Sequence, residues 1–388
     1  MPRQLVVLLE PLSDLIAKGE VVARYYNPGD VFDDVQFLLL NSDRPDRDAL
    51  QGMCGRAEVS VHNLDLAPGL FRRTLGWRPE LMLRELAAGT ALARGIAPDL
   101  VRTYGAGLNG MFATVIGEAL RRPVLLSLHN RPDAVIASGA ADWLRQKALQ
   151  GLAARVLRNA TVVMAVYKAQ LDYLARLGVE ATLAYNMIGS SAMPVKSDYA
   201  VGSRVRAISV GRQFPGKDVS DVIEAVTRVP ELDLTVVGDG PLHDRLVARA
   251  SALGVGGRVS FVKAISNAQL CASLHKYDVF VSHNRHPGIP KAVMEPMLAG
   301  LPVIMNRIGG GGDADLEGAA VLVEDSVAGY EGALIEMVRC EAHRSRIGIA
   351  CRDLAAKTWD PVEAEARQAA LTRRVLGGAL DRASAVAG

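Results

Sequence analysis

Two basic residues, Arg212 and Lys217, stand five positions apart in the segment VGRQFPGK at 210–217. The segment follows a predicted strand and precedes a predicted helix, so both side chains can converge across one turn. An arginine can hold an oxyanion through two parallel N–H groups, and a lysine acts on it as a point charge. The pair is therefore a candidate diphosphate site, with two solvated basic residues of a loop as the plainer alternative.

The same segment comes close to the nucleotide-binding P-loop pattern G-x-x-x-x-G-K, running from Gly211 to Lys217. Asp218 stands where a P-loop needs Ser or Thr to hold magnesium, and its carboxylate would lie close to bound phosphates. Pro215 removes one of the backbone N–H groups that cradle those phosphates. We therefore favour the diphosphate pair over a P-loop.

A second segment, VVGDGP at 236–241, ends a predicted strand in a Gly-Asp-Gly-Pro turn before a helix. Proline suits a first helical position and glycine a tight turn. The segment lacks the third glycine of a dinucleotide-binding fingerprint. By itself it is typical of a structural turn.

A third segment, PGIPKAVMEPMLAGLPVI at 287–304, leads from a loop into a helix that carries Glu295. The free N–H groups at the start of a helix suit an anion. Glu295 lies more than a turn inside the helix, where its carboxylate can accept hydrogen bonds from sugar hydroxyls. A single glutamate on a helix is more often solvated, so Glu295 by itself is weak evidence for a sugar-binding site.

Short apolar runs alternate with amphipathic stretches along the whole chain. Continuous apolar strands separated by helices predict parallel sheets covered on both faces, an α/β fold. The predicted strands are 4–9, 35–40, 57–61, 99–104, 123–128, 161–166, 181–185, 205–210, 232–237, 258–262, 278–282, 302–306 and 320–324.

The alternation pauses at a stretch rich in Ser, Gly and Pro, which predicts a linker between two domains. We place the first domain at 1–190, the linker at 191–203 and the second domain at 204–360. A C-terminal helix, 361–388, can cross back to the first domain. Open α/β sheets bind ligands beyond the carboxyl ends of their strands, so two doubly wound, Rossmann-like domains would face each other across a binding cleft.

Composition excludes several classes of protein. The 388 residues carry a formal net charge of +2, which argues against general nucleic-acid binding. No apolar run approaches the length of a membrane span, and the N-terminus lacks a signal-peptide pattern. Four scattered cysteines without a C-x-x-C pair indicate reduced thiols. We expect a cytoplasmic protein.

Taken together and in this order, the three segments resemble glycosyltransferase family 4, the retaining nucleotide-sugar transferases with the GT-B fold. The resemblance covers about residues 205–310 and includes an R-V-x-F strand, with Pro296 in place of the family's Ala. The matching segments are Val210–Lys217, Val237–Pro241, Arg258–Phe261 and Glu295–Val303.

The resemblance implies a role for each matching position of the second domain. Arg212 and Lys217 would bind and stabilise the donor diphosphate, in place of a metal ion, and Glu295 would bind the ribose. The loop of Lys263, Ala264 and Ile265 would line the base, and backbone N–H groups around Gly288 and Ile289 would face the donor phosphate or sugar.

The first domain resembles the family more weakly. Gly19, in LIAKGE at 15–20, best matches the glycine loop that approaches the phosphates, although the usual glycine pair is absent. His129, in SLHN, matches a histidine near the donor sugar, where it would act in catalysis. The plainer alternative is a histidine that hydrogen-bonds its own loop.

One position departs from the family. In the E-x7-E motif that ends at Glu295, the first glutamate, which contacts the donor sugar, falls on Pro287. His286, Asn284 or Lys291 could substitute as sugar contacts. The departure also leaves a non-catalytic nucleotide-sugar-binding relative open.

As a whole, the resemblance implies sugar transfer from a nucleotide diphosphate sugar to an acceptor hydroxyl, in surface polysaccharide or glycolipid assembly. UDP-sugars are favoured and GDP-sugars possible as donors, with an acceptor saccharide or lipid-linked saccharide and no cofactor. A nucleotide-sugar epimerase of the same fold is the other alternative.

Three further features are less specific. The segment 70–86 mixes apolar and Arg residues, so it can form a helix that lies peripherally on the inner face of the plasma membrane, although an ordinary solvated helix is favoured. The D-x-D of Asp313 and Asp315, and the pair His283 and His286, could each be considered as metal ligands. Neither has the surroundings that a metal site needs, so we expect no metal.

Overall fold

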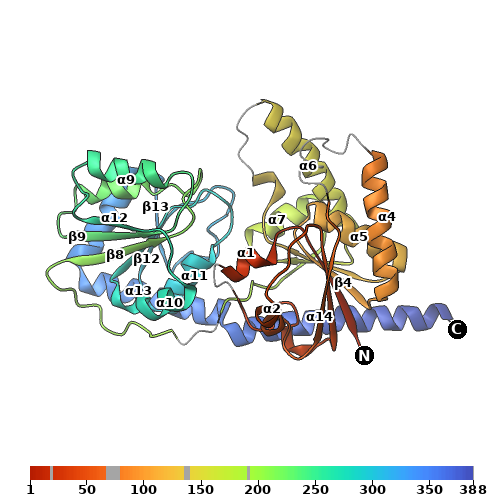
Figure 1. Cartoon of the computed structure of the whole chain (residues 1–388). Coiled ribbons are helices and arrows are strands. Elements are labelled where there is room, and N and C mark those ends of the chain that lie inside the picture. The colour runs from red at the N-terminus through yellow and green to blue at the C-terminus, as the bar shows by residue number, and fades with distance from the viewer. Residues whose placement is uncertain (18–20, 67–78, 135–139, 190–192, 388) are drawn as a thin grey trace. The chain divides into compact units, whose positions relative to one another are not determined.

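The computed structural model describes the chain except residues 18–20, 67–78, 135–139, 190–192 and 388. By its internal contacts the chain divides into two compact units (Figure 1). The first comprises Met1–Gly189 together with Pro361–Gly388, and the second Ser190–Asp360. Each unit is built on one parallel sheet.

The first unit contains a seven-stranded parallel sheet, in the order β3-β2-β1-β4-β5-β6-β7 among the described residues. Its central strands are almost fully buried, with β4 carrying the buried polar residues Arg102 and Thr103 among apolar ones. The strands are β1 (Arg3–Leu8), β2 (Asp34–Leu39), β3 (Glu58–Asn63), β4 (Leu100–Tyr104), β5 (Val124–Leu128), β6 (Val162–Ala165) and β7 (Ala181–Leu183).

Helices alternate with the strands of this unit, as the sequence predicts. Helix α2 begins after Asp46, whose carboxylate accepts the amide of Ala49 at 2.8 Å. Helices α1 and α2 are short, with six and eight residues. The helices are α1 (Leu12–Ala17), α2 (Arg47–Cys54), α4 (Pro79–Ile96), α5 (Leu108–Leu120), α6 (Ala140–Asn159) and α7 (Ala169–Arg176), with short 3-10 turns η1 (Pro28–Asp30) and η2 (Pro132–Ala134).

The second unit contains a six-stranded parallel sheet, in the order β10-β9-β8-β11-β12-β13 within the described ranges. The strand order reverses between β8 and β11, and this reversal is where open α/β sheets bind ligands. The strands are β8 (Val205–Val210), β9 (Leu232–Val237), β10 (Val259–Val262), β11 (Val279–Ser282), β12 (Val303–Asn306) and β13 (Val321–Val323).

The helices of the second unit follow the predicted alternation, which confirms two doubly wound α/β sheets. Among the helices that the structure describes in either unit, none combines the length and apolar character that a membrane span needs. The helices here are α8 (Ser220–Val226), α9 (His243–Ala252), α10 (Asn267–Ser273), α11 (Lys291–Leu298), α12 (Val327–Arg339) and α13 (Glu341–Trp359), with the 3-10 turn η3 (Leu274–Lys276) after α10.

The segment that follows residue 192, where the sequence predicts a linker, packs against the second unit. Tyr199 donates its hydroxyl to the carbonyl of Gly300 at 2.8 Å, and buried Arg344 donates to the carbonyl of Tyr199 at 2.9 and 3.0 Å. Lys196, also buried, pairs with Asp278 at 3.3 Å. These contacts fix the segment that precedes β8 to the rest of the second unit.

The last helix, α14 (Pro361–Ala387), belongs to the first unit although it follows the second in sequence. The carboxylate of Glu365 accepts hydrogen bonds from the Arg24 guanidinium and, at 2.9 Å, from the amide of Gly29. Gly29 has a φ of +65°, and a Cβ there would come within 2.8 Å of Ala369, so the close approach of the helix favours glycine.

The hydrogen bond from Arg24 holds the pKa of Glu365 below its ordinary value, with burial opposing. Since the folded pKa is depressed, the ionised carboxylate stabilises the fold above the unfolded pKa, and this stabilisation is lost as pH falls through the folded value. We therefore expect Glu365→Gln to lower the free energy of unfolding of the first unit by about 1 kcal/mol at neutral pH.

Urea denaturation at several pH values checks this expectation. The difference between variant and wild type should shrink as pH falls below about 4. Glu180→Gln, a change of an exposed glutamate in the same unit, serves as the matched control. A deficit of Glu365→Gln that stayed constant down to acidic pH would contradict the role of the ionised carboxylate.

Candidate functional site

The second unit has a pocket at the reversal of its strand order. It lies at the carboxyl ends of β8 and β11, where the loops that follow these two strands meet the start of α11. Its lining includes Arg212, Gln213 and Lys217 from the first loop, His283 and Asn284 from the second, and Pro290 before α11.

Arg212 and Lys217 are brought together on one aromatic ring. The guanidinium carbon of Arg212 lies 5.4 Å from the centre of the Phe214 ring, and the ammonium of Lys217 lies 5.8 Å from it. In the part of the chain that the structure describes, neither side chain forms an ion pair with a carboxylate. Burial, and then the charge of Arg212, lower the pKa of Lys217. The pocket thus holds two cations whose mutual repulsion an anion would relieve.

Gln213 fixes the turn that carries these cations. Its side chain donates to the carbonyl of Gly238 at 2.8 Å, and its oxygen lies 2.9 Å from Nδ1 of His243. Gly238 has a φ of +134°, and a Cβ there would lie 2.0 Å from the carbonyl oxygen of Gly211. The Gly-Asp-Gly-Pro turn therefore braces the basic turn, and no sequence pattern pointed to Gln213.

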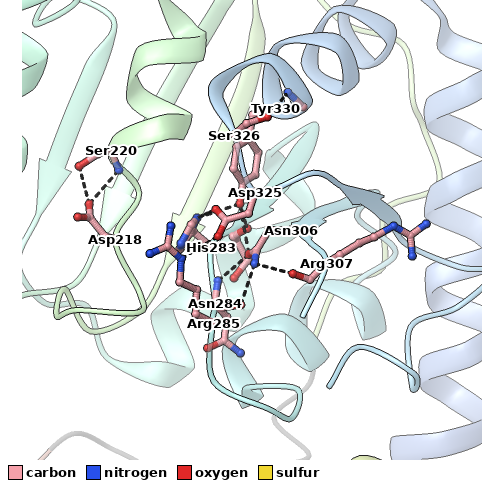
Figure 2. A network of polar contacts seen from close by, with 12 residues as sticks. Asp218, Ser220, His283, Asn284, Arg285, Asn306, Arg307, Asp325, Ser326 and Tyr330 are labelled. Atoms are coloured by element: carbon pink, nitrogen blue, oxygen red, sulfur yellow. Dashed lines mark hydrogen bonds and ion pairs between the residues drawn. The ribbon is translucent and has the colours of Figure 1, made fainter. Parts of the chain in front are cut away.

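The loop after β11 is held by a pair of asparagines, as Figure 2 shows. The side chain of Asn284 donates to the carbonyls of His286 at 2.9 Å and Gly288 at 3.1 Å. Asn306, on β12, accepts the amide of Asn284 at 2.8 Å and donates to its carbonyl at 3.0 Å. Asn284, one of the predicted substitute sugar contacts, is thus engaged in shaping its own loop.

Two more of the suggested substitutes lie close by. The ring of His286 lies 5.4 Å from that of Phe214, and its Nε2 is 3.4 Å from the carbonyl of Pro215, so it packs against the basic turn. Lys291 is the first residue of α11. His286 therefore lies against the turn that carries Arg212 and Lys217, and Lys291 lies between the pocket-lining residues Pro290 and Ala292.

The backbone at Gly288 is partly engaged within the protein. Its N–H donates to the carbonyl of Gly312 at 3.2 Å, and a Cβ on Gly312 would approach Pro287 to 3.1 Å. Ile289 follows and is buried. The predicted role of these amides toward a donor stays a prediction, and Gly288 could fill it only by sharing its N–H.

Glu295 lies buried in α11 and meets the element that follows the predicted base-binding loop. Its Oε1 accepts a hydrogen bond of 2.8 Å from the side chain of Asn267, the first residue of α10. Exposed Lys263 and Ala264, with half-buried Ile265, connect β10 to the N-cap Ser266. One hydrogen bond thus links the predicted ribose-binding carboxylate to this loop region.

Two of the predicted site residues, Gly19 and His129, belong to the first unit. His129 follows β5, and its ring centre lies 5.6 Å from that of Tyr104 at the end of β4. Gly19 lies outside the described residues, as does most of 70–86, of which only the start of α4 is described.

The two histidines considered as metal ligands contact different neighbours, and the two aspartates lie in another loop. His283 turns to Tyr330 at 3.2 Å, whereas His286 packs on Phe214. Asp313 and Asp315 are buried in the loop after β12. Over the described ranges, no group of three or more His, Cys, Asp or Glu side chains is placed to share a metal ion.

Both halves of the chain match models of known families. Residues 21–184 match the glycosyl transferase 4-like domain, and residues 200–353 match the glycosyl transferases group 1. A GDP-mannose-dependent α-(1-6)-phosphatidylinositol monomannoside mannosyltransferase of Mycolicibacterium smegmatis is 29% identical over 178 residues, which are 42% of this chain and 47% of that relative. The chain spans about half the length of several curated relatives that it matches.

Solved structures show the same fold over nearly the whole chain. Sucrose-phosphate synthase from Thermosynechococcus elongatus superposes with a TM-score of 0.74 and 17% identity, over 97% of this chain and 100% of that one. HepE of Anabaena, in complex with UDP and glucose, superposes with a TM-score of 0.72 and 16% identity, over 96% and 99%. With both family models and both sheets in agreement, the chain belongs to the family 4 type of glycosyltransferases with the GT-B fold.

Proposed function

We propose that this protein is a retaining glycosyltransferase, which moves a sugar from a nucleotide diphosphate sugar to an acceptor hydroxyl. The observation that carries the proposal is the pair Arg212 and Lys217. Both lie on Phe214, line the pocket at the switch point of the second sheet and lack carboxylate partners among the described residues. This is a site prepared for a multiply charged anion.

The chemical task of this pair is electrostatic. As the bond between the anomeric carbon and the diphosphate oxygen breaks, negative charge grows on the leaving nucleoside diphosphate. Arg212 and Lys217 stabilise that charge and take the place of a metal ion. The acceptor oxygen bonds to the anomeric carbon on the face that the diphosphate leaves, and the leaving diphosphate takes the acceptor proton. Configuration at the sugar is thereby retained.

The nucleotide is held by groups farther along the same unit. Glu295, oriented by Asn267, binds the ribose hydroxyls, and the loop of Lys263, Ala264 and Ile265 lines the base. The relative from Mycolicibacterium is named for GDP-mannose, and HepE holds UDP and glucose. We favour a UDP-sugar donor and keep a GDP-sugar as the second choice.

We place the acceptor among saccharides or lipid-linked saccharides, in the assembly of surface polysaccharide or glycolipid. The matched relative from Mycolicibacterium is named for a phosphatidylinositol monomannoside, which supports a lipid-linked acceptor. Such an acceptor fits a cytoplasmic protein. For residues 70–86 we favour an ordinary solvated helix, with peripheral contact with the inner face of the plasma membrane as the alternative. His129 serves catalysis by contacting the donor sugar.

Pro287 favours a second candidate, a nucleotide-sugar-binding protein without transferase activity. A proline cannot supply the sugar-contacting carboxylate of the family motif, whereas the cation pair that binds the diphosphate is intact. An epimerase of the same fold is the remaining alternative.

A thermal-shift panel of UDP, GDP, ADP and their sugars, followed by product analysis, separates these candidates. We expect stabilisation by one nucleotide and slow release of free nucleotide from its sugar, as a transferase gives without acceptor. Binding without any turnover would favour the non-catalytic protein, and interconversion of the sugar an epimerase. No stabilisation by any nucleotide would falsify the proposal and the epimerase alternative.

Replacing either cation removes stabilisation of the leaving group. Arg212→Ala and Lys217→Ala should each lower turnover about 10²- to 10³-fold while the thermal unfolding temperature stays near wild type. Arg249→Ala, a change of an exposed arginine on α9 of the same unit, is the matched control. Near-normal turnover in either pocket variant would show that the diphosphate binds elsewhere.

The proposed binding of the ribose by Glu295 can be tested separately. Glu295→Gln should weaken binding of UDP or GDP about tenfold, because a neutral amide accepts ribose hydroxyl hydrogen bonds less strongly than a carboxylate. Inorganic diphosphate should bind variant and wild type equally, measured by calorimetry. If binding of inorganic diphosphate fell by the same factor, Glu295 would act through the shape of the pocket instead.

A further inference from the structure

His283 lies in the same pocket as Arg212 and Lys217, and the proposed chemistry does not yet use it. It is the first residue after β11, its side chain is only 3% exposed, and it lines the pocket. A histidine so placed has two distinct ring nitrogens, and their contacts decide what the ring can do.

The Nδ1 side of the ring is occupied. The hydroxyl of Tyr330, on α12, lies 3.2 Å from Nδ1, 3.1 Å from the carbonyl of Ser282 and 3.4 Å from the side-chain oxygen of Asn306 (Figure 2). The last two groups only accept, so the single hydroxyl proton goes to one of them. The oxygen of Tyr330 then accepts from Nδ1–H, and His283 carries its proton on Nδ1.

The carboxylate of Asp325 also lies near Nδ1 of His283. Oδ1 of Asp325 is 3.6 Å from Nδ1 of His283, and Arg285 donates to the other oxygen of Asp325 at 2.7 Å. Nε2 has no hydrogen bond to any residue that the structure describes. It is thus the ring nitrogen available to a ligand in the pocket.

The charges around His283 come from several elements. Burial lowers its pKa below the ordinary value, Asp325 opposes this, and Arg285 adds to it. The carboxylates of Asp218 and Asp221 raise the pKa of His283. The cations Arg212 and Lys217 line the same pocket as His283. The ring is therefore neutral in the unliganded protein at neutral pH.

We infer that His283 is a third diphosphate-binding group of this pocket, and that its Nε2 takes up a proton as the diphosphate binds. The inference rests on the proposed function. A proton passes from solvent or buffer to Nε2, which then donates to a phosphate oxygen. The imidazolium lies between the phosphate and the carboxylate of Asp325, and each anion favours the charged ring. Tyr330 and Asp325 act as positioning residues.

The inference fixes the sign of a pH effect. Since the anion raises the pKa of His283, the gain in affinity is complete below the pKa of the free protein and fades as pH rises through that of the complex. Lys217 could also exchange a proton on binding, because its pKa is lowered as well. An experiment must therefore separate the two groups.

Calorimetric titration with a nucleotide sugar measures the proton directly. UDP-glucose and GDP-mannose are suitable probes because both phosphates are esterified, so the ligand itself does not titrate near neutral pH, unlike a phosphate monoester. Titrations at about pH 6.5, in two buffers of different ionisation enthalpy, give the number of protons taken up.

We expect net proton uptake in the wild type and in Lys217→Arg, whose guanidinium does not titrate, and almost none in His283→Gln. His343→Gln, a change of a histidine on α13 outside the pocket lining, should behave as wild type. The affinity of His283→Gln should be about tenfold weaker at about pH 6 and approach that of wild type at about pH 8.5.

Asp325→Asn keeps the imidazole and removes the carboxylate behind it, so it tests the inference even if His283→Gln binds nothing. The pH of half-maximal uptake should shift downward in this variant. Uptake that persists in His283→Gln, or binding to the wild type without uptake between about pH 5.5 and 7.5, would overturn the inference while leaving the proposed function intact. Failure of both probes, and of every other nucleotide sugar, to bind would instead overturn the proposed function, and the role of His283 with it.

Discussion

Two positive charges within one turn are the constraint on which the second unit depends. Arg212 and Lys217 repel each other, and burial, followed by the charge of Arg212, lowers the pKa of Lys217. The turn stays folded because Phe214 offers its ring face to both cations and Gln213 ties the turn to the neighbouring Gly-Asp-Gly-Pro turn. The glycine at 238 is required because the two backbones nearly touch. Under the proposed function, this turn holds the two cations in place before an anionic ligand binds.

The same constraint explains why the site lies where the strand order reverses. The loops that follow β8 and β11 run in opposite directions from the sheet and leave a crevice between them. Charged side chains of both loops can line this crevice. The loop after β11 needs its own support, which Asn284 and Asn306 give through hydrogen bonds between neighbouring strands. Each wall of the pocket is thereby held by the sheet.

The sequence predicts the two sheets and the cation pair because their signals are local. An apolar run, a turn and a basic spacing can each be recognised within about ten residues. Contacts between distant segments leave no such signal: Tyr330 meets His283 from 47 positions away, and Glu365 meets Arg24 from 341 positions away. The role of Gln213, the contacts of α14 with Arg24 and Gly29, and the surroundings of His283 could therefore be found only in the structure.

Pro287 is best understood through the charge balance of the pocket. A glutamate at this position would bring a negative charge to the loop that now runs from Asn284 to the contact between Gly288 and Gly312. Without it, the pocket wall carries Arg212 and Lys217 with no added carboxylate from position 287, and the proposed site would favour a diphosphate over a neutral sugar. Under the proposed function, nucleotide binding and sugar recognition are then separable. The first depends on a turn that is fully in place, and the second on whichever neutral polar groups replace the missing carboxylate.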